Sequence, residues 1–183
     1  MKDYRSYIEV VEKMTDSLTW LSKLFTEMDK IIDQEKVFIS SRSGKDFEKV
    51  LTAKQDCSSL IEKKVKKLSD YSFILQGKLG VTVSTVGELI STLSEVDFDK
   101  SMESKVLVHN IEKLKDSHKN LSAIRKKVNP KIEQNAYLIQ TLLVRYREHL
   151  KCLRTAASSA DALYTAEGSE KVNFGGSIFE VKA

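Results

Sequence analysis

The 183-residue chain contains only one proline and seven glycines, fewer turn-forming residues than folds with many tight turns require. This scarcity disfavours β-sandwiches, β-barrels and doubly wound sheets, because each needs frequent turns. No apolar run reaches the roughly 18 residues of a membrane-spanning helix, and the first residues lead into no stretch of signal-peptide type. We therefore expect a mostly helical, cytoplasmic protein without membrane insertion.

Residues and motifs that carry chemistry are also few. Cys57 and Cys152 lie far apart without CxxC spacing, so we interpret them as reduced thiols. Of the three histidines, His118 and His149 would lie about 45 Å apart on one helix, too far to share a substrate or a metal ion. The chain contains no glycine-rich phosphate loop and no HExxH or GxSxG motif. We expect no catalytic residues, no metal site and no cofactor, and hence no enzyme.

Hydrophobic periodicity is the strongest signal in the sequence. Apolar side chains recur at spacings of three and four, which is typical of amphipathic helices. The predicted helices span about 3–41, 45–76, 85–94 and 101–157. Thr85 and Glu88 form a capping box before the third helix, and the register of the fourth continues across Pro130, which predicts a kink and not a boundary. The predicted fold class is all-α, an elongated antiparallel helical bundle or coiled coil with one long C-terminal helix.

We expect a single helical-bundle domain over 1–157, followed by a flexible tail over 158–183, because the residues after Leu153 are small and polar. Charge suggests how the long helices pair. Residues 3–41 carry eight acids and five bases, net −3, whereas residues 103–154 carry five acids and twelve bases, net +7. We predict that these two helices lie side by side and run antiparallel.

The segment from Ala136 to Leu153 has more apolar surface than one neighbouring helix can cover. The side chains concerned are Leu138, Ile139, Leu142, Leu143, Tyr146, Leu150 and Leu153. Two interpretations stay open. In the first, this surface is covered by the second helix or by self-association, for example in a homodimer. In the second, the surface forms a groove for the amphipathic helix of a partner.

Two basic runs, Lys63–Lys67 and Arg125–Lys127, have the charge that nucleic acids attract. Neither run is interleaved with the aromatic residues on which bases stack. The acidic first helix would also neutralise part of the second run. We therefore interpret both as solvated helix faces and expect no nucleic-acid partner.

Three motifs lie in the C-terminal third of the chain. They are Asn135-Ala136-Tyr137-Leu138-Ile139, Leu163-Tyr164-Thr165-Ala166-Glu167-Gly168 and the closing Ser177-Ile178-Phe179-Glu180-Val181-Lys182-Ala183. With the long amphipathic first helix, they resemble the FlgN family of flagellar export chaperones, which escort hook–filament junction proteins to the export apparatus. This sequence departs from the family in having Thr165 where glycine is frequent.

The resemblance implies a cytosolic chaperone that binds the C-terminal helical segment of hook-associated proteins and delivers them to the flagellar type III export apparatus. It would place the cargo groove at the seven apolar side chains between Leu138 and Leu153. It would also assign Tyr164 to contact with the flagellar export gate. The alternative function is a structural coiled-coil adaptor or a self-assembling helical bundle without an export role.

Overall fold

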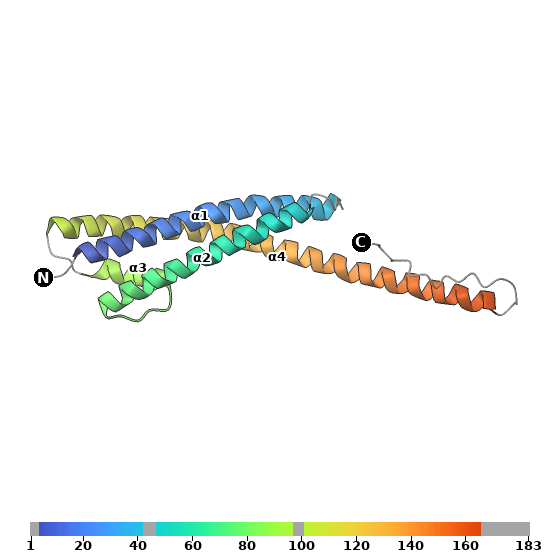
Figure 1. Ribbon diagram of the computed structural model, residues 1–183. Coiled ribbons are helices and arrows are strands. Elements are labelled where there is room, and N and C mark those ends of the chain that lie inside the picture. The colour runs from blue at the N-terminus through green and yellow to red at the C-terminus, as the bar shows by residue number, and fades with distance from the viewer. Residues whose placement is uncertain (1–3, 42–46, 97–100, 166–183) are drawn as a thin grey trace. The chain divides into compact units, whose positions relative to one another are not determined.

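The computed structural model describes residues 4–41, 47–96 and 101–165, and all regular structure in these ranges is helical (Figure 1). The helices are α1 (Tyr4–Ser41), α2 (Phe47–Leu79), α3 (Val86–Glu95) and α4 (Met102–Thr165). The predicted all-α helical bundle is confirmed. The predicted helices begin and end within a few residues of these bounds, except at the end of α4.

The chain divides into two compact units, Met1–Asn135 and Ala136–Ala183. The first contains α1, α2, α3 and α4 as far as Asn135, and the second contains the remainder of α4. Residues 136–157, which the sequence analysis assigned to the helical-bundle domain, lie in the second unit. The last buried residue of the first unit on α4 is Asn135, which is 1% exposed and hydrogen-bonded to α1.

Helix α4 continues to Thr165, eight residues beyond the predicted end at 157. The apolar stripe fades there, but four alanines, at 156, 157, 160 and 162, have the highest helix propensity of any residue and favour a helix without a stripe. Residues 166–183, the rest of the predicted tail, lie outside the described residues. The helix also continues through Pro130, whose side chain is exposed.

The helices α1 and α4 run parallel, so the predicted antiparallel pairing of these two is wrong. Lys127 on α4 binds Asp29 on α1, and Lys131 binds Asp33, so both pairs are 98 residues apart in the sequence. A constant separation arises only when residue numbers rise in the same direction along both helices. Opposite charges attract in either orientation, so the net charges of −3 and +7 could not decide it.

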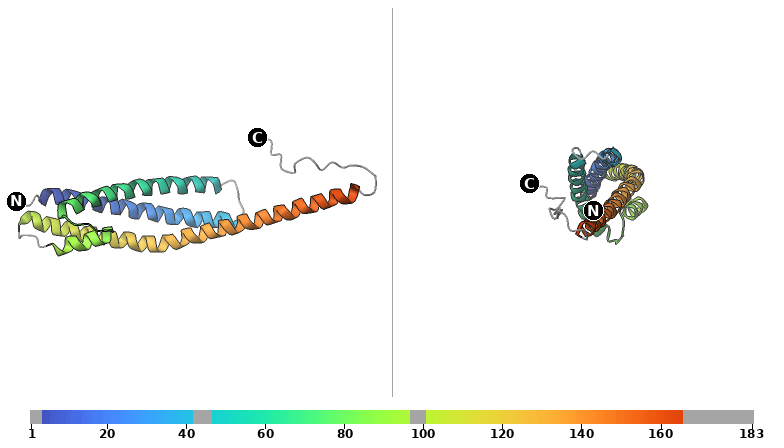
Figure 2. Two further views of the ribbon diagram at one scale, coloured as in Figure 1. Left: turned by 90° about the horizontal axis from the view of Figure 1, so that it is seen from below. Right: turned by 90° about the vertical axis from the view of Figure 1, so that its right-hand side faces the viewer.

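Connectivity explains the direction of α4. Along α2, partner numbers fall as those of α1 rise: the Tyr7 hydroxyl donates to the Lys78 carbonyl oxygen at 2.6 Å, whereas Glu35 pairs with Lys54. Helix α2 is therefore antiparallel to α1. Three successive long helices joined by reversals place the first and third parallel (Figures 1 and 2).

A short connection and α3 join α2 to α4. Gly80 adopts a positive φ of 66°, which reverses the chain after α2, and the Gln76 side-chain oxygen accepts a hydrogen bond from the Val83 amide. Residues 81–83 are not helical. Helix α3 then begins with the predicted capping box, in which Thr85 and Glu88 bind each other's backbone amides. The box fixes the start of α3.

The core of the first unit is formed by one apolar side of each helix. The largest cluster joins α1, the second half of α2, α3 and the start of α4. A smaller one joins the second half of α1 to the first half of α2 and to α4 around Val128. The side chains with the least exposure include Val11, Met14, Leu75, Leu89, Leu93, Leu107, Leu114 and Val128. At about 25 cal/mol per Å² of buried apolar area, such side chains supply most of the stability of the unit.

Candidate functional site

Four of the seven side chains in the apolar face predicted on residues 138–153 are exposed to solvent. Leu142 is 41% exposed, Leu143 52%, Tyr146 62% and Leu153 64%. Leu138, Ile139 and Leu150 are half-buried. All seven side chains lie on α4, and within the second unit they form one surface, which we call the α4 apolar face.

Helical geometry shows how this face is bordered. At about 100° per residue, the α4 apolar face covers roughly 140° of the helix circumference. Arg145 lies at one edge, while Arg147 and Arg154 lie near the other, and all three are exposed. The single acid between residues 136 and 157, Glu148, lies outside the face. The surface is therefore an apolar strip between two basic edges.

Tyr164 lies near the end of α4, but its side chain is outside the described side chains. Its predicted role as a contact residue therefore has no structural description. The other seven predicted residues share a single helix, so the structure brings them together by periodicity alone. No contact between distant segments is needed to assemble the face.

A buried polar cluster lies at the end of the first unit, around Asn135. The Glu35 carboxylate is fully buried and receives the Lys54 ammonium at 2.7 and 2.8 Å. The Asn135 side-chain amide donates to the same carboxylate at 3.0 Å and to the Ile32 carbonyl oxygen at 2.9 Å. The cluster thus joins α1, α2 and α4. A shift of α4 along α1 would leave these buried polar groups without hydrogen-bond partners, so the cluster specifies the register of the helices.

A second polar contact joins α1 to α4 nearer the surface. Asp29 pairs with Lys127 at 2.6 Å and with Lys131 at 2.7 Å, and Lys131 also binds Asp33. The hydrogen bonds from Lys127 and then Lys131 lower the pKa of Asp29 below its usual value, against the smaller opposing effect of burial. Asp29 and Asp33 in turn raise the pKa of Lys131. These groups hold α1 and α4 together.

The cysteines and histidines do not assemble into a site in the described part of the chain. Burial raises the pKa of the Cys57 thiol, and the nearby Glu27 charge adds to this effect. Its Sγ lies 3.5 Å from the Leu24 carbonyl oxygen, so the thiol has a structural partner. Cys152 is exposed. Among the described residues there is no group of three or more side chains that could hold a metal ion.

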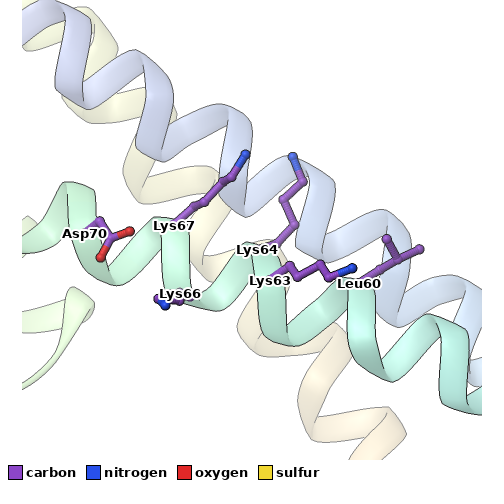
Figure 3. A pocket seen from close by; sticks show the side chains of 6 residues that line it. All are labelled: Leu60, Lys63, Lys64, Lys66, Lys67 and Asp70. Atoms are coloured by element: carbon purple, nitrogen blue, oxygen red, sulfur yellow. The ribbon is translucent and has the colours of Figure 1, made fainter.

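The first basic run lies on α2 beside an aromatic residue that the sequence did not reveal as its neighbour. Figure 3 shows Leu60, Lys63, Lys64, Lys66, Lys67 and Asp70 around a shallow hollow of about 430 Å³. The Lys64 ammonium lies 5.1 Å from the centre of the Trp20 ring on α1, and the Lys23 ammonium lies 5.5 Å from it. Trp20 is distant from the run in sequence, so only the antiparallel packing of α1 and α2 could reveal this contact.

The second basic run borders a different hollow, of about 320 Å³, between the helices of the first unit. Its lining includes His118, Ser122, Arg125 and Lys126 from α4 and Val86 from α3. The Arg125 guanidinium lies 5.8 Å from the Phe25 ring. The start of α3 adds little attraction for an anion here, because the Glu88 carboxylate already binds the amides of Ser84 and Thr85.

Comparisons of the chain with family models, curated proteins and solved structures found no match. The resemblance to the FlgN family therefore depends on the sequence motifs alone. None of the helices in the described ranges combines the length and apolar character needed to cross a membrane.

Proposed function

We propose that this protein is a helix-binding chaperone whose α4 apolar face holds an amphipathic helix of a partner protein. The observation that carries the proposal is the exposure of four large apolar side chains on one face of α4, between 41% and 64%. Exposed apolar strips of this kind are costly in water and are typical of interaction surfaces. A partner helix with apolar residues at i, i+3, i+4 and i+7 has the matching geometry.

The basic edges indicate which helix fits. Arg145 on one side and Arg147 and Arg154 on the other would pair with acidic residues that flank the apolar stripe of the partner. Two copies of the α4 apolar face would instead bring like charges together, because residues 136–157 carry four bases and one acid. Charge therefore favours a different protein as the partner over a second copy of this chain.

We further propose that the partner is the C-terminal helical segment of a hook-associated protein, and that the chain is a cytosolic export chaperone of the flagellar type III apparatus. Support for this narrower proposal comes from the motifs at Asn135–Ile139 and Leu163–Gly168 and from the match between an open apolar strip and a helical cargo. On this proposal Tyr164 contacts the export gate, and no reaction is catalysed. Cargo must be released on delivery, so we expect a dissociation constant between micromolar and nanomolar. This range corresponds to a binding free energy of about −8 to −12 kcal/mol.

The proposal can be tested by fluorescence anisotropy with a labelled peptide from the C-terminal helix of a hook-associated protein. The substitution Leu142→Asp places a charge in the centre of the α4 apolar face and should weaken binding about 30-fold or more, because interface centres carry most of the binding energy. Val144→Asp is the matched control. Val144 is similarly exposed, at 47%, but lies on the opposite side of α4, so binding should not change.

Equal affinity in the wild type and Leu142→Asp would exclude the α4 apolar face as the binding surface. Circular dichroism should show the same helix content in all three proteins. Light scattering tests the alternative of a self-assembling bundle. A mass that rises with concentration in the wild type and returns to the monomer value in Leu142→Asp would favour self-association over the chaperone.

A further inference from the structure

The basic run of α2 and Trp20 of α1 form a second surface that the proposed function does not use. It consists of Trp20, Lys23, Leu60, Lys63, Lys64 and Lys67, and we call it the Trp20 surface. Trp20 is 51% exposed and Leu60 is 49% exposed. In the close view of α2 in Figure 3, Lys63 extends beside Leu60 along the edge of the hollow.

The lysines of this surface have few negative partners. Within the described ranges, Lys63, Lys66 and Lys67 form no ion pair, in contrast to Lys54, Lys127 and Lys131. Asp70 is the one acid that lines the hollow, against four lysines. Ammonium groups at i, i+1, i+3 and i+4 on one helix repel one another. A ligand with several negative charges would relieve this repulsion.

We propose that the Trp20 surface binds an acidic peptide segment of a protein partner, with one apolar side chain of the peptide lying against Leu60 and Trp20. Carboxylates of the segment pair with Lys63, Lys64 and Lys67. From Leu60 to Lys67 the helix rises about 10 Å, which corresponds to about three residues of extended peptide. The surface therefore suits a short acidic stretch.

The width of the surface favours a peptide over a membrane. A flat anionic bilayer would contact the lysines together with exposed acids of the same two helices, including Asp16 on α1 and Asp56 and Asp70 on α2. These acids would cancel part of the attraction, which is only about 1 kcal/mol per lysine at a membrane surface. A narrow peptide contacts the lysines and, of these acids, only Asp70, which lines the hollow.

The state of the Trp20 ring disfavours a single-stranded nucleic acid. In proteins that bind single-stranded nucleic acids, the bases stack chiefly on exposed aromatic faces. Two ammonium groups, of Lys23 and Lys64, already lie 5.5 and 5.1 Å from the centre of the ring. A base would have to displace these cation–π contacts, whereas an aliphatic side chain can pack against the ring edge without displacing them.

The experiment uses the chain's own fluorescence. Trp20 is the single tryptophan of the sequence, so tryptophan emission, excited at a wavelength that tyrosine does not absorb, reports on this surface. The full-length protein is titrated with an acetylated decapeptide of two Glu-Glu-Leu-Glu-Glu repeats, and separately with the same peptide carrying glutamine in place of glutamate. A saturable change is expected for the first peptide and not for the second, and raising the salt from about 20 to 150 mM should weaken it because salt screens exposed charges.

Charge reversal locates the site. The double variant Lys63→Glu/Lys67→Glu should bind the acidic peptide at least about tenfold more weakly, equivalent to about 1.4 kcal/mol. Lys115→Glu/Lys119→Glu is the matched control, because it reverses two exposed lysines at the same i, i+4 spacing on α4. Its affinity should stay within about twofold of the wild type.

Three outcomes would overturn the proposal: no saturable change, an equal response to the glutamine peptide, or equal weakening in both double variants. Tighter binding to phosphatidylserine vesicles or to an oligothymidine strand than to the acidic peptide would also overturn it, in favour of a membrane or a nucleic acid. The variant Leu142→Asp should respond to the peptide as the wild type does. The result is therefore independent of the proposed binding of a partner helix by the α4 apolar face.

Discussion

The helix α4 carries the same apolar spacing in both compact units, yet the two parts differ in what covers that spacing. In the first unit Leu107, Leu114 and Val128 are fully buried, whereas in the second unit Leu143 and Leu153 are 52% and 64% exposed. In the first unit the facing sides of α1, α2 and α3 supply the cover. Hydrophobic periodicity therefore shows that a helix face packs against another apolar surface. It does not show whether that surface belongs to the same chain or to a different molecule.

Truncation of equivalent leucines should show the largest difference between the two units. Leu114→Ala removes a fully buried side chain and should lower the free energy of unfolding by about 3 kcal/mol, because a cavity is left in a packed core. Leu143→Ala, in the α4 apolar face, should change it by less than about 0.5 kcal/mol. Urea denaturation followed by Trp20 fluorescence measures both. Similar losses for the two variants would mean that the α4 apolar face is packed in solution.

Removing one member of the polar cluster at the end of the first unit should have the next largest effect. Lys54→Met leaves the fully buried Glu35 carboxylate without its cation and should destabilise the protein by about 2 kcal/mol, at the lower end for buried pairs because Lys54 is 24% exposed. The double variant Glu35→Met/Lys54→Met removes the uncompensated charge and should be closer to the wild type in urea denaturation. A double variant less stable than Lys54→Met would contradict this account.

The contact between Asp29 and its two lysines should give a smaller effect that depends on pH. The folded-state pKa of Asp29 is lowered, so its contribution to stability is present above the unfolded-state pKa, about 3.9, and is lost as the pH falls through the lower folded value. Asp29→Asn should cost about 1 kcal/mol at pH 7 and much less near pH 2. Urea denaturation at both pH values measures the difference, and a cost that does not change with pH would show that charge is not its origin.

Much of the first unit followed from local sequence signals. The spacing of apolar residues predicted four helices, and Thr85 with Glu88 predicted the start of α3, because both signals arise within a few residues of the chain. Helix direction could not be predicted from net charge, since attraction between opposite charges does not depend on orientation. The continuation of α4 to Thr165 was missed because an alanine-rich segment forms a helix without an apolar stripe.

The candidate surfaces were predictable to different extents. The seven residues of the α4 apolar face could be named because they lie within 16 positions of one helix, from Leu138 to Leu153. Trp20 and Lys64 are separated by most of α1 and α2, and only the packing of these helices brings them together. Sequence periodicity identifies surfaces built on one element, and it does not identify surfaces built from two.

The parallel pairing of α1 and α4 has a consequence for how the protein folds. Contacts such as Asp29 with Lys127 are 98 residues apart, whereas Glu35 and Lys54 on α1 and α2 are only 19 apart. Closing a longer loop costs more chain entropy, and contacts between distant residues slow folding. The α1–α2 hairpin should therefore form first during synthesis, with its α4-facing groove empty until α4 has been translated. During that interval the nascent chain exposes the apolar sides of α1 and α2 that become buried against α4 once folding is complete.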